Sequence, residues 1–168
     1  ILHNLAAQMK DRHEELSLTI AQEGGKPLKD ARVEVTRAVN TVTLSAEEAT
    51  QIDGEQQAMG GTAGNENKIT LTLREPIGVV SSISAFNHPV NLIAHQVAPP
   101  LAAGNAVVLK PSGDTPISAL KMGEMLQKAG LPDGYLNILP CEPPVAQTLA
   151  TDSRINYLSF IGSAKVGW

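Results

Sequence analysis

The sequence predicts a doubly wound α/β fold built on a mostly parallel sheet. Short apolar runs rich in β-branched residues recur from residue 76 onward, and segments with helical spacing of apolar residues separate them. Polar or glycine-containing turns follow these runs, as in the loops at the carboxyl edge of a parallel sheet. We therefore expect at least four strands separated by three helices, with two further helices and one strand before them.

Two helices are predicted before the sheet. Residues 1–22 carry apolar side chains at helical spacing and are predicted to form one amphipathic helix, which residues 24–27 (GGKP) then break. A second, longer helix is predicted over residues 28–51. The buried positions expected in these helices are Leu5, Met9, Leu16, Ile20, Ala31, Val35, Ala38, Val39 and Val42.

The stretch between these helices and the sheet consists of two segments with different residue patterns. Residues 53–67 are rich in glycine and polar residues and show no period, which predicts a loop. Residues 68–74 (KITLTLR) alternate polar and apolar side chains, which predicts a half-exposed strand. A strand without a neighbour is an edge that can accept a partner strand.

The predicted sheet begins with an apolar strand and a polar turn. Residues 78–83 show no helical period and are expected to form a strand buried on both faces. The turn that follows contains Asn87, which is well suited to cap a helix, and Pro89, which suits a first helical turn. A helix is therefore expected to begin directly after this turn.

That helix leads into the second strand of the sheet. It is predicted over residues 90–103, and Pro99-Pro100 is expected to kink it or restart it. Gly104-Asn105 then turns the chain into a second buried strand at residues 106–109. These elements complete one βαβ unit.

The remaining elements continue the alternation. Residues 114–116 (DTP) predict the start of a helix that Gly130 ends. Its expected buried stripe consists of Ile117, Leu120, residues 122–126 and Ala129. The elements predicted after it are a strand at 135–139, a short helix at 143–150, a strand at 155–160 and a helix that opens at Gly162-Ser163.

Composition excludes several classes of function. The net charge is −4, and acidic and basic residues are interspersed, so neither a nucleic-acid footprint nor a polybasic membrane patch is expected. A single cysteine and the lack of a signal-peptide pattern predict a reducing compartment, the cytoplasm. Five aromatic residues are few for a complete domain, and the chain starts and stops within predicted helices. We therefore expect a piece of a longer protein.

Three positions carry a structural and a functional interpretation. Asn87 is either a helix cap or a donor to an oxyanion. Lys110, at the end of the second strand, is either solvated or grips a ribose or a phosphate. Gly162-Ser163 is either an ordinary turn or an anion site at a helix N-terminus.

Other candidate groups are assigned structural roles. Cys141 has no activating base or cation nearby in sequence, so we interpret it as structural. His88 and His95 are expected to be a turn residue and a helix-packing residue. No cluster has the spacing of metal ligands, and no G-x-G-x-x-G follows a strand.

Several short strings together resemble the aldehyde dehydrogenase superfamily, in its order and at nearly its spacing. The resemblance covers the amino-terminal part of the cofactor-binding domain, a variant of the Rossmann fold. The matching strings are residues 76–79 (PIGV), 86–89 (FNHP), 110–112 (KPS), 130–137 (GLPDGYLN) and 160–163 (FIGS).

The resemblance implies roles for particular residues. The family's asparagine at the position of Asn87 stabilises the oxyanion formed when a cysteine attacks the aldehyde. Its lysine at the position of Lys110 contacts a ribose, and its serine at the position of Ser163 contacts the pyrophosphate of NAD or NADP. The cofactor-binding residues implied are Ile83, Ser84, Ala85, Phe86, Lys110, Ser112, Gly113, Phe160, Gly162, Ser163 and Val166.

Two departures from the family pattern affect the cofactor site. NAD-preferring members usually carry a glutamate where this chain has Gly113, so the resemblance leaves the choice between NAD and NADP open. Residues 141–147 lack the glycines found there in the family and are one residue shorter, which implies a different adenine pocket.

The resemblance also implies an organisation and partners. Residues 1–52 would form helices that pack on the cofactor domain, residues 53–75 a loop and a bridging strand, and residues 76–168 part of the NAD(P)-binding domain. The bridging strand implies a homo-oligomer, a dimer or tetramer. The nucleophilic cysteine and the general-base glutamate would lie downstream of residue 168.

Three functions remain open at this point. The first is oxidation of an aldehyde to a carboxylic acid with NAD(P)+, and the histidine after Asn87 favours small polar or phosphorylated aldehydes. The second is an acylating or acyl-phosphate-type reductase that shares the sheet and the cysteine. The third is a non-enzymatic protein that binds a nucleotide or pairs through residues 68–74.

Overall fold

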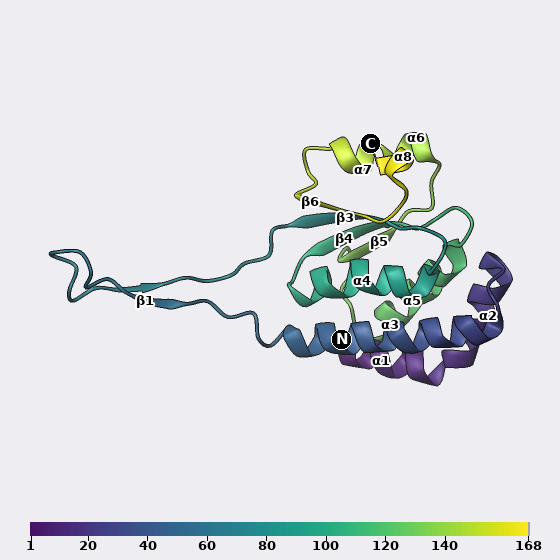
Figure 1. The fold of residues 1–168 in the computed structure, drawn as a ribbon, viewed down its shortest axis with the longest axis horizontal. Helices are drawn as coiled ribbons and strands as arrows, with labels where there is room; N and C mark the ends of the chain where they lie inside the picture. The colour runs from purple at the N-terminus through teal and green to yellow at the C-terminus, as the bar shows by residue number, and fades with distance from the viewer. Residues whose placement is uncertain (168) are drawn as a thin grey trace.

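The computed structural model describes residues 1–167 and contains a four-stranded parallel sheet with helices on both faces (Figure 1). The strand order across the sheet is β5-β4-β3-β6, and every neighbouring pair is parallel. The predicted α/β fold class is therefore confirmed. The strands are β3 (Val79–Ile83), β4 (Ala106–Lys110), β5 (Leu136–Ile138) and β6 (Tyr157–Phe160).

The strand order contains a topological switch point beside β3. The chain runs from β3 outward through β4 to β5, and then returns to place β6 on the other side of β3. Ile83 pairs with Lys110 of β4 on one side and with Phe160 of β6 on the other. Because ligands of open α/β sheets bind where the strand order reverses, this edge is the natural place for a site.

Two long helices cover one face of the sheet and three short ones cover the other (Figure 1). The long ones are α4 (Pro89–Ala102) and α5 (Pro116–Lys128), and the short ones are α6 (Pro143–Ala146), α7 (Thr148–Thr151) and α8 (Ala164–Gly167). The single helix predicted over 143–150 is wrong. Ala150 N bonds to Gln147 O, three residues back, so the helical ladder is interrupted between α6 and α7.

Helix α4 is continuous through Pro99 and Pro100, so the predicted restart is wrong. Proline at position 100 has no N–H to donate to the carbonyl of Gln96. That carbonyl instead accepts a 3.1 Å hydrogen bond from Ser82 Oγ of β3. The helix keeps its direction because the sheet satisfies the oxygen that the proline leaves unpaired.

Helix α5 begins and ends as predicted, and Met122, Met125, Leu126 and Ala129 of the predicted stripe are buried, but its first two positions are not. Ile117 and Leu120 are both 45% exposed, whereas Ser118 and Ala119 are fully buried. Ser118 faces inward because its backbone N–H and hydroxyl bond to Glu23. A polar contact from another helix therefore sets the orientation that apolar spacing left ambiguous.

Three helices, α1 (Leu2–Asp11), α2 (His13–Gly24) and α3 (Leu28–Glu48), form a layer outside α4 and α5 (Figure 1). All nine predicted core positions in them are buried. The single helix predicted over 1–22 is wrong, because it breaks at Arg12 (φ −100°, ψ 22°).

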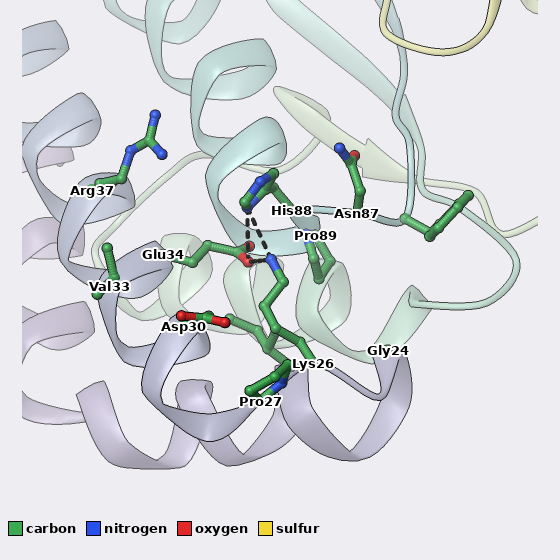
Figure 2. Close-up of a pocket in the computed structure, with 12 residues that line it drawn as sticks. Gly24, Lys26, Pro27, Asp30, Val33, Glu34, Arg37, Asn87, His88 and Pro89 are labelled. Atoms are coloured by element: carbon green, nitrogen blue, oxygen red, sulfur yellow. Dashed lines mark hydrogen bonds and ion pairs between the residues drawn. The ribbon is translucent and has the colours of Figure 1, made fainter.

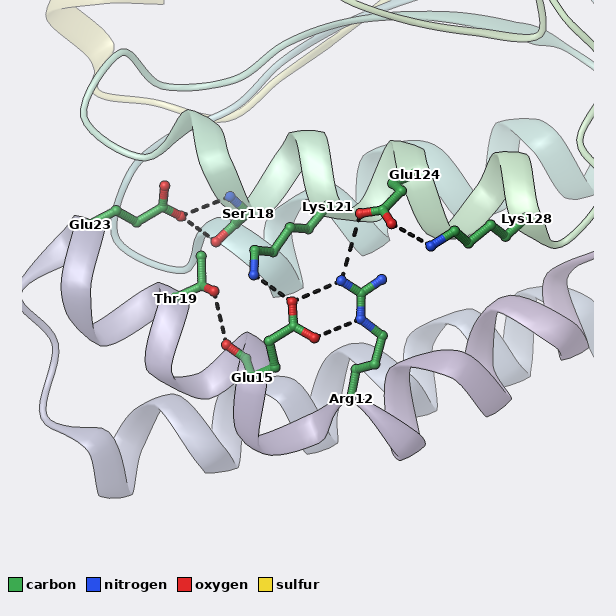
Figure 3. A network of polar contacts seen from close by, with 8 residues as sticks. All are labelled: Arg12, Glu15, Thr19, Glu23, Ser118, Lys121, Glu124 and Lys128. Atoms are coloured by element: carbon green, nitrogen blue, oxygen red, sulfur yellow. Dashed lines mark hydrogen bonds and ion pairs between the residues drawn. The ribbon is translucent and has the colours of Figure 1, made fainter.

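Arg12 lies at the centre of a polar network that joins these helices to α5 (Figure 3). Its guanidinium donates a 2.7 Å hydrogen bond to Glu15 and lies 3.7 Å from Glu124 of α5. Lys121 of α5 also bonds to Glu15. The network thus ties the junction between α1 and α2 to α5.

A hairpin projects from the body of the molecule (Figure 1). It pairs β1 (Gln56–Ala58) with β2 (Ile69–Leu71) in antiparallel register. The loop predicted at 53–67 thus contains a short strand, which forms because β2 offers it an open edge. Residues 68–74 are not half-exposed as predicted: Ile69, Leu71 and Leu73 are 71%, 69% and 83% exposed.

Candidate functional site

The carboxyl ends of β3, β4 and β6 are tied together at the switch point. Ser84 N, just after β3, donates to the carbonyl oxygen of Lys110 at 3.0 Å, and Ile161 N, just after β6, donates to that of Ile83 at 3.0 Å. The structure therefore brings together three groups of predicted site residues: 83–86, 110–113 and 160–163. Open α/β sheets have a crevice outside the carboxyl ends of the strands at such a switch point, and the loops that carry these residues meet there.

Gln96 of α4 connects two strands at this edge. Sequence reasoning missed this role. Its side-chain amide Nε2 donates to Ile83 O at 3.0 Å and to Ser159 O at 2.9 Å, so it bridges β3 and β6. The side chain is 2% exposed. A polar residue within an apolar helix face was the only local signal of this role.

Lys110 is the last residue of β4 and is buried, with 9% of the residue exposed. Its Nζ takes part in none of the hydrogen bonds or ion pairs formed among residues 1–167. The stem of Lys110 is thus covered, while Nζ is not among the buried polar atoms without a partner in the described residues. An ammonium group in such surroundings is stabilised by any anionic or hydroxyl oxygen that reaches it.

The residues near Lys110 leave open space and one polar atom without a hydrogen-bond partner. Ser84 is 6% exposed, and its Oγ is buried without a partner among residues 1–167. Ser112 Oγ accepts a 3.3 Å hydrogen bond from Asp114 N. Gly113 has nothing within 4 Å of the place where a Cβ would lie, so the glycine is not required by packing. Phe86 is 58% exposed.

The turn after β6 wraps around the ring of Phe160. A Cβ on Gly162 would lie 2.6 Å from Phe160 Cζ, and one on Gly167 would lie 2.9 Å from its Cε1. The carbonyl of Ser163 accepts hydrogen bonds from Val166 N at 3.0 Å and Gly167 N at 3.1 Å. Glycine is therefore needed at 162 because the ring occupies the space of a side chain.

Asn87 does not cap α4, contrary to that interpretation. The N-cap position is His88, which makes no side-chain cap, and the carboxylate of Glu34 in α3 takes the role instead. Glu34 Oε1 accepts from Val90 N at 2.9 Å and from Asn91 N at 3.2 Å. Asn87 is exposed, and its amide points away from Glu34 (Figure 2).

Glu34 is held by two basic side chains. It is 2% exposed, Lys26 Nζ donates to its Oε2, and His88 Nδ1 lies 3.4 Å from the same oxygen. Lys26 Nζ is also 2.9 Å from His88 Nδ1. Sequence reasoning missed this cluster, although a carboxylate between the apolar positions Ala31 and Val35 was a signal of a buried ion pair.

A second carboxylate closes the N-terminus of α5 (Figure 3). Glu23 of α2 accepts from Ile117 N at 2.8 Å and from Ser118 N at 3.0 Å. Helix N-termini attract phosphates through free N–H groups, and here those of both α4 and α5 are already bonded to carboxylates. These amides are therefore not free to bind a phosphate.

A pocket of about 480 Å³ opens beside Asn87 (Figure 2). Arg37 of α3 lines it and was not predicted. Arg37 is exposed and forms no ion pair within the described part of the chain. In Figure 2 it lies on the same side of the Glu34–Lys26 pair as Asn87, whereas Asp30 lies on the other side.

Of the remaining candidates, His88 lines this pocket, whereas Cys141 and His95 lie outside it. Cys141 is a half-buried free thiol on the loop before α6. His88 is a turn residue, as predicted, whereas His95 is exposed and lies 3.4 Å from Thr41 Oγ1 of α3. No group of three or more His, Cys, Asp or Glu residues that could hold a metal occurs within residues 1–167. Within the same range, no helix is long and apolar enough to cross a membrane.

Two known proteins that resemble this chain are both dehydrogenases of aldehydes. The 3-sulfolactaldehyde dehydrogenase of Priestia aryabhattai is 42% identical over 168 residues, which are 99% of this chain and 35% of that protein. The lactaldehyde dehydrogenase of Methanocaldococcus jannaschii is 36% identical over 99% of this chain and 36% of its own length. The chain therefore spans about a third of the length of the curated relatives it matches.

Solved structures agree with the sequence comparison. Aldehyde dehydrogenase 21 from Physcomitrella patens, in complex with succinate, superposes with a TM-score of 0.95 at 43% identity, over 99% of this chain and 35% of that one. NADP-dependent glyceraldehyde-3-phosphate dehydrogenase from Bacillus halodurans, complexed with NADP, gives 0.93 at 36% identity, with the same coverage. The model of the aldehyde dehydrogenase family matches residues 1–168. The chain belongs to the aldehyde dehydrogenase family.

Proposed function

We propose that this chain is the amino-terminal part of an NAD(P)-dependent enzyme that oxidises an aldehyde to a carboxylic acid. One observation carries the proposal: Lys110, which has no partner in the described chain, ends β4 beside the start of the turn after β3, whose Asn87 does not cap α4. Family membership supports it, and the nucleophilic cysteine and the base glutamate are proposed to lie outside these 168 residues.

The crevice residues fit a dinucleotide. Lys110 and Ser112 would hold a ribose, and the turn at Gly162-Ser163 would receive the pyrophosphate because α4 and α5 are closed by carboxylates. The orphaned Ser84 Oγ offers a further partner. The other contacts proposed are Ile83, Ala85, Phe86, Gly113, Phe160 and Val166.

Either nicotinamide nucleotide is proposed as the cofactor, with Gly113 favouring NADP. A glutamate at this position would repel a 2′-phosphate, and glycine does not. Two similar solved structures, from Bacillus halodurans and Methanocaldococcus jannaschii, contain NADP. A bound nicotinamide would supply the hydride acceptor.

Asn87 is proposed to stabilise the oxyanion of the reaction. A thiolate adds to the aldehyde carbon, and the former carbonyl oxygen becomes an oxyanion to which Nδ2–H of Asn87 donates. Loss of hydride converts the adduct to a thioester, and water releases the acid and the thiol. A donor of this kind contributes about 2.7–4 kcal/mol in the transition state.

The substrate is proposed to be a small aldehyde with an anionic group. Arg37 has no ion-pair partner in the described chain and lines the same pocket as Asn87. A guanidinium suits carboxylate, sulfonate or phosphate groups. The names of the relatives include 3-sulfolactaldehyde and glyceraldehyde-3-phosphate, and one similar structure holds succinate as its product.

The test measures kcat/KM of the full-length protein for succinate semialdehyde and for butanal, which share a four-carbon chain. Arg37→Met should lower kcat/KM for the anionic aldehyde roughly 10–100-fold and leave butanal unchanged. Arg32→Met, in the exposed pair with Glu14, is the matched control. Equal effects on both aldehydes would exclude Arg37 from substrate recognition, and absence of NAD(P)-dependent oxidation would refute the proposed activity.

A homo-oligomer, dimer or tetramer, is also proposed for the full-length protein. The projecting hairpin exposes Ile69, Leu71 and Leu73, and apolar side chains displayed in this way mark an interface. Light scattering should give a smaller mass for Leu71→Lys than for the wild type. An unchanged mass would remove the hairpin from the interface.

A further inference from the structure

We propose that Glu34, together with Lys26, is a positioning residue that sets the place of Asn87 for catalysis. The inference rests on the proposed role of Asn87 in the oxyanion site. It goes beyond that role because Glu34 belongs to α3, lies 53 positions earlier in the chain, and is not expected to touch the reacting atoms.

Glu34 determines where α4 begins. Pro89 has no N–H, so Val90 N and Asn91 N are the first donors that the start of the helix must satisfy. Both donate to Glu34 Oε1, at 2.9 and 3.2 Å. A helix cap is normally supplied by the residue preceding the helix, whereas here a rigid neighbouring helix supplies it.

The side chain of Glu34 is itself held in place by Lys26. The side chain is buried, and a buried carboxylate needs a cation and further donors to remain charged. Lys26 Nζ supplies the cation at Oε2, directly after the left-handed Gly25 (φ 66°) that ends α2. The carboxylate therefore has donors on both oxygens and one orientation.

The Glu34–Lys26 pair is connected to Asn87 through His88. His88 follows Asn87 directly, and its Nδ1 lies 3.4 Å from Glu34 Oε2 and 2.9 Å from Lys26 Nζ (Figure 2). The pair thus contacts the chain through the side chain of the residue next to Asn87 and through the amides at the start of α4. Asn87 itself forms no hydrogen bond to the pair, so its amide stays available.

The consequence is that loss of the carboxylate should move the turn without removing the donor. In Glu34→Gln the amide oxygen can still accept from Val90 N and Asn91 N, but the Nε2 donor replaces the oxygen that accepts from Lys26 Nζ. A donor then faces a donor, so the side chain shifts and residues 87–89 shift with it. A displacement of about 1 Å at a reacting group can cost 100-fold in rate. The effect belongs to the chemical step, not to nucleotide binding at the crevice.

The test is a double-mutant cycle in the full-length protein, with NAD(P)H formation followed in a single turnover. Glu34→Gln alone should slow hydride transfer on the order of 10–100-fold and leave the nucleotide Kd unchanged. In the Asn87→Ala background, the same substitution should change the rate by less than about threefold, because the donor it positions is gone. Glu14→Gln, in an exposed ion pair of α2, is the control and should have no effect.

Equal slowing by Glu34→Gln in both backgrounds would assign Glu34 a purely structural role and overturn the inference. An unchanged rate for Glu34→Gln would overturn it as well. An unchanged rate for Asn87→Ala would instead refute the proposed role of Asn87, so the two failures are distinct. If Glu34→Gln does not fold, Lys26→Met in the same cycle decides, with slowing on the order of 10-fold expected only when Asn87 is present.

Discussion

The side-chain amide of Gln96 donates a 3.0 Å hydrogen bond to the carbonyl oxygen of Ile83, the last residue of β3. The same Nε2 reaches Ser159 O of β6 at 2.9 Å, so one buried amide of α4 joins the two strands that border the switch-point crevice. Glu34 holds the beginning of α4 in the same way. The crevice is therefore shaped by side chains of α4, which covers one face of the sheet, and of α3, which lies outside α4.

Gln96→Leu should lower the free energy of unfolding by about 1–3 kcal/mol, because it removes the donor shared by two buried carbonyl oxygens. Urea unfolding of the chain measures this change. Gln22→Leu, at an exposed position of α2, is the control and should stay within about 0.5 kcal/mol of the wild type. Similar values for the two variants would show that the bridge does not hold the strands.

Gly162→Ala should destabilise the turn after β6, because the new Cβ would lie 2.6 Å from Phe160 Cζ and the ring must move. Overpacking of this kind costs about 1–3 kcal/mol. Gly113→Ala is a matched control, since nothing lies within 4 Å of its Cβ position. Thermal unfolding of both variants measures the difference. If Gly162→Ala unfolds at the wild-type temperature, the ring does not determine this turn.

Gly113→Glu should shift the nucleotide preference toward NAD. The site has room for the side chain, and its carboxylate would repel the 2′-phosphate of NADP. Calorimetric titration should show the Kd for NADP rising by about tenfold or more, with the Kd for NAD no weaker. A parallel change in both constants would place residue 113 away from the adenosine ribose.

Stability should fall in acid partly through Glu15. Hydrogen bonds from Arg12, and then from Lys121, lower the pKa of Glu15 from its ordinary 4.5 to about 2. A carboxylate whose pKa is lower in the folded state stabilises the fold above pH 4.5, and this contribution is lost as the pH falls toward 2. Because Glu15 is partly exposed, it amounts to about 1 kcal/mol or less.

Urea unfolding of Glu15→Gln between pH 7 and pH 2 checks this. The variant should be less stable than the wild type at pH 7, and the difference should shrink below pH 4.5. A difference that stays constant over the whole range would mean that the carboxylate charge plays no part in the network of Figure 3.

The strand order could not be read from the sequence, but the strands and the loops of the crevice could. The runs at 78–83 and 106–109 lack polar residues at helical spacing, and each ends in a polar turn, so both strands were predictable. Lys110 and the turn at 162–163 follow strands directly, and the parallel topology gathers them at one edge.

The residues that shape the crevice from a distance were not predictable. Glu34, Glu23 and Gln96 act on groups 13 to 95 positions away, and spacing within a helix gives no signal of such contacts. The break at Arg12 was also missed, because apolar spacing continues across it through Leu5, Met9, Leu16 and Ile20. Asn87 was taken as a possible cap because local propensity favours asparagine there, but a long-range carboxylate has that role.

Nucleotide binding through Lys110 is the most direct test of this account. Calorimetric titration of NADP and NAD into the full-length protein should detect binding of at least one nucleotide. Lys110→Ala should weaken that binding roughly 10–100-fold, because a charged hydrogen bond from its ammonium is lost, while Lys10→Ala at an exposed site of α1 should not. A wild-type Kd in the Lys110→Ala variant, or no binding of either nucleotide to the wild type, would contradict the account.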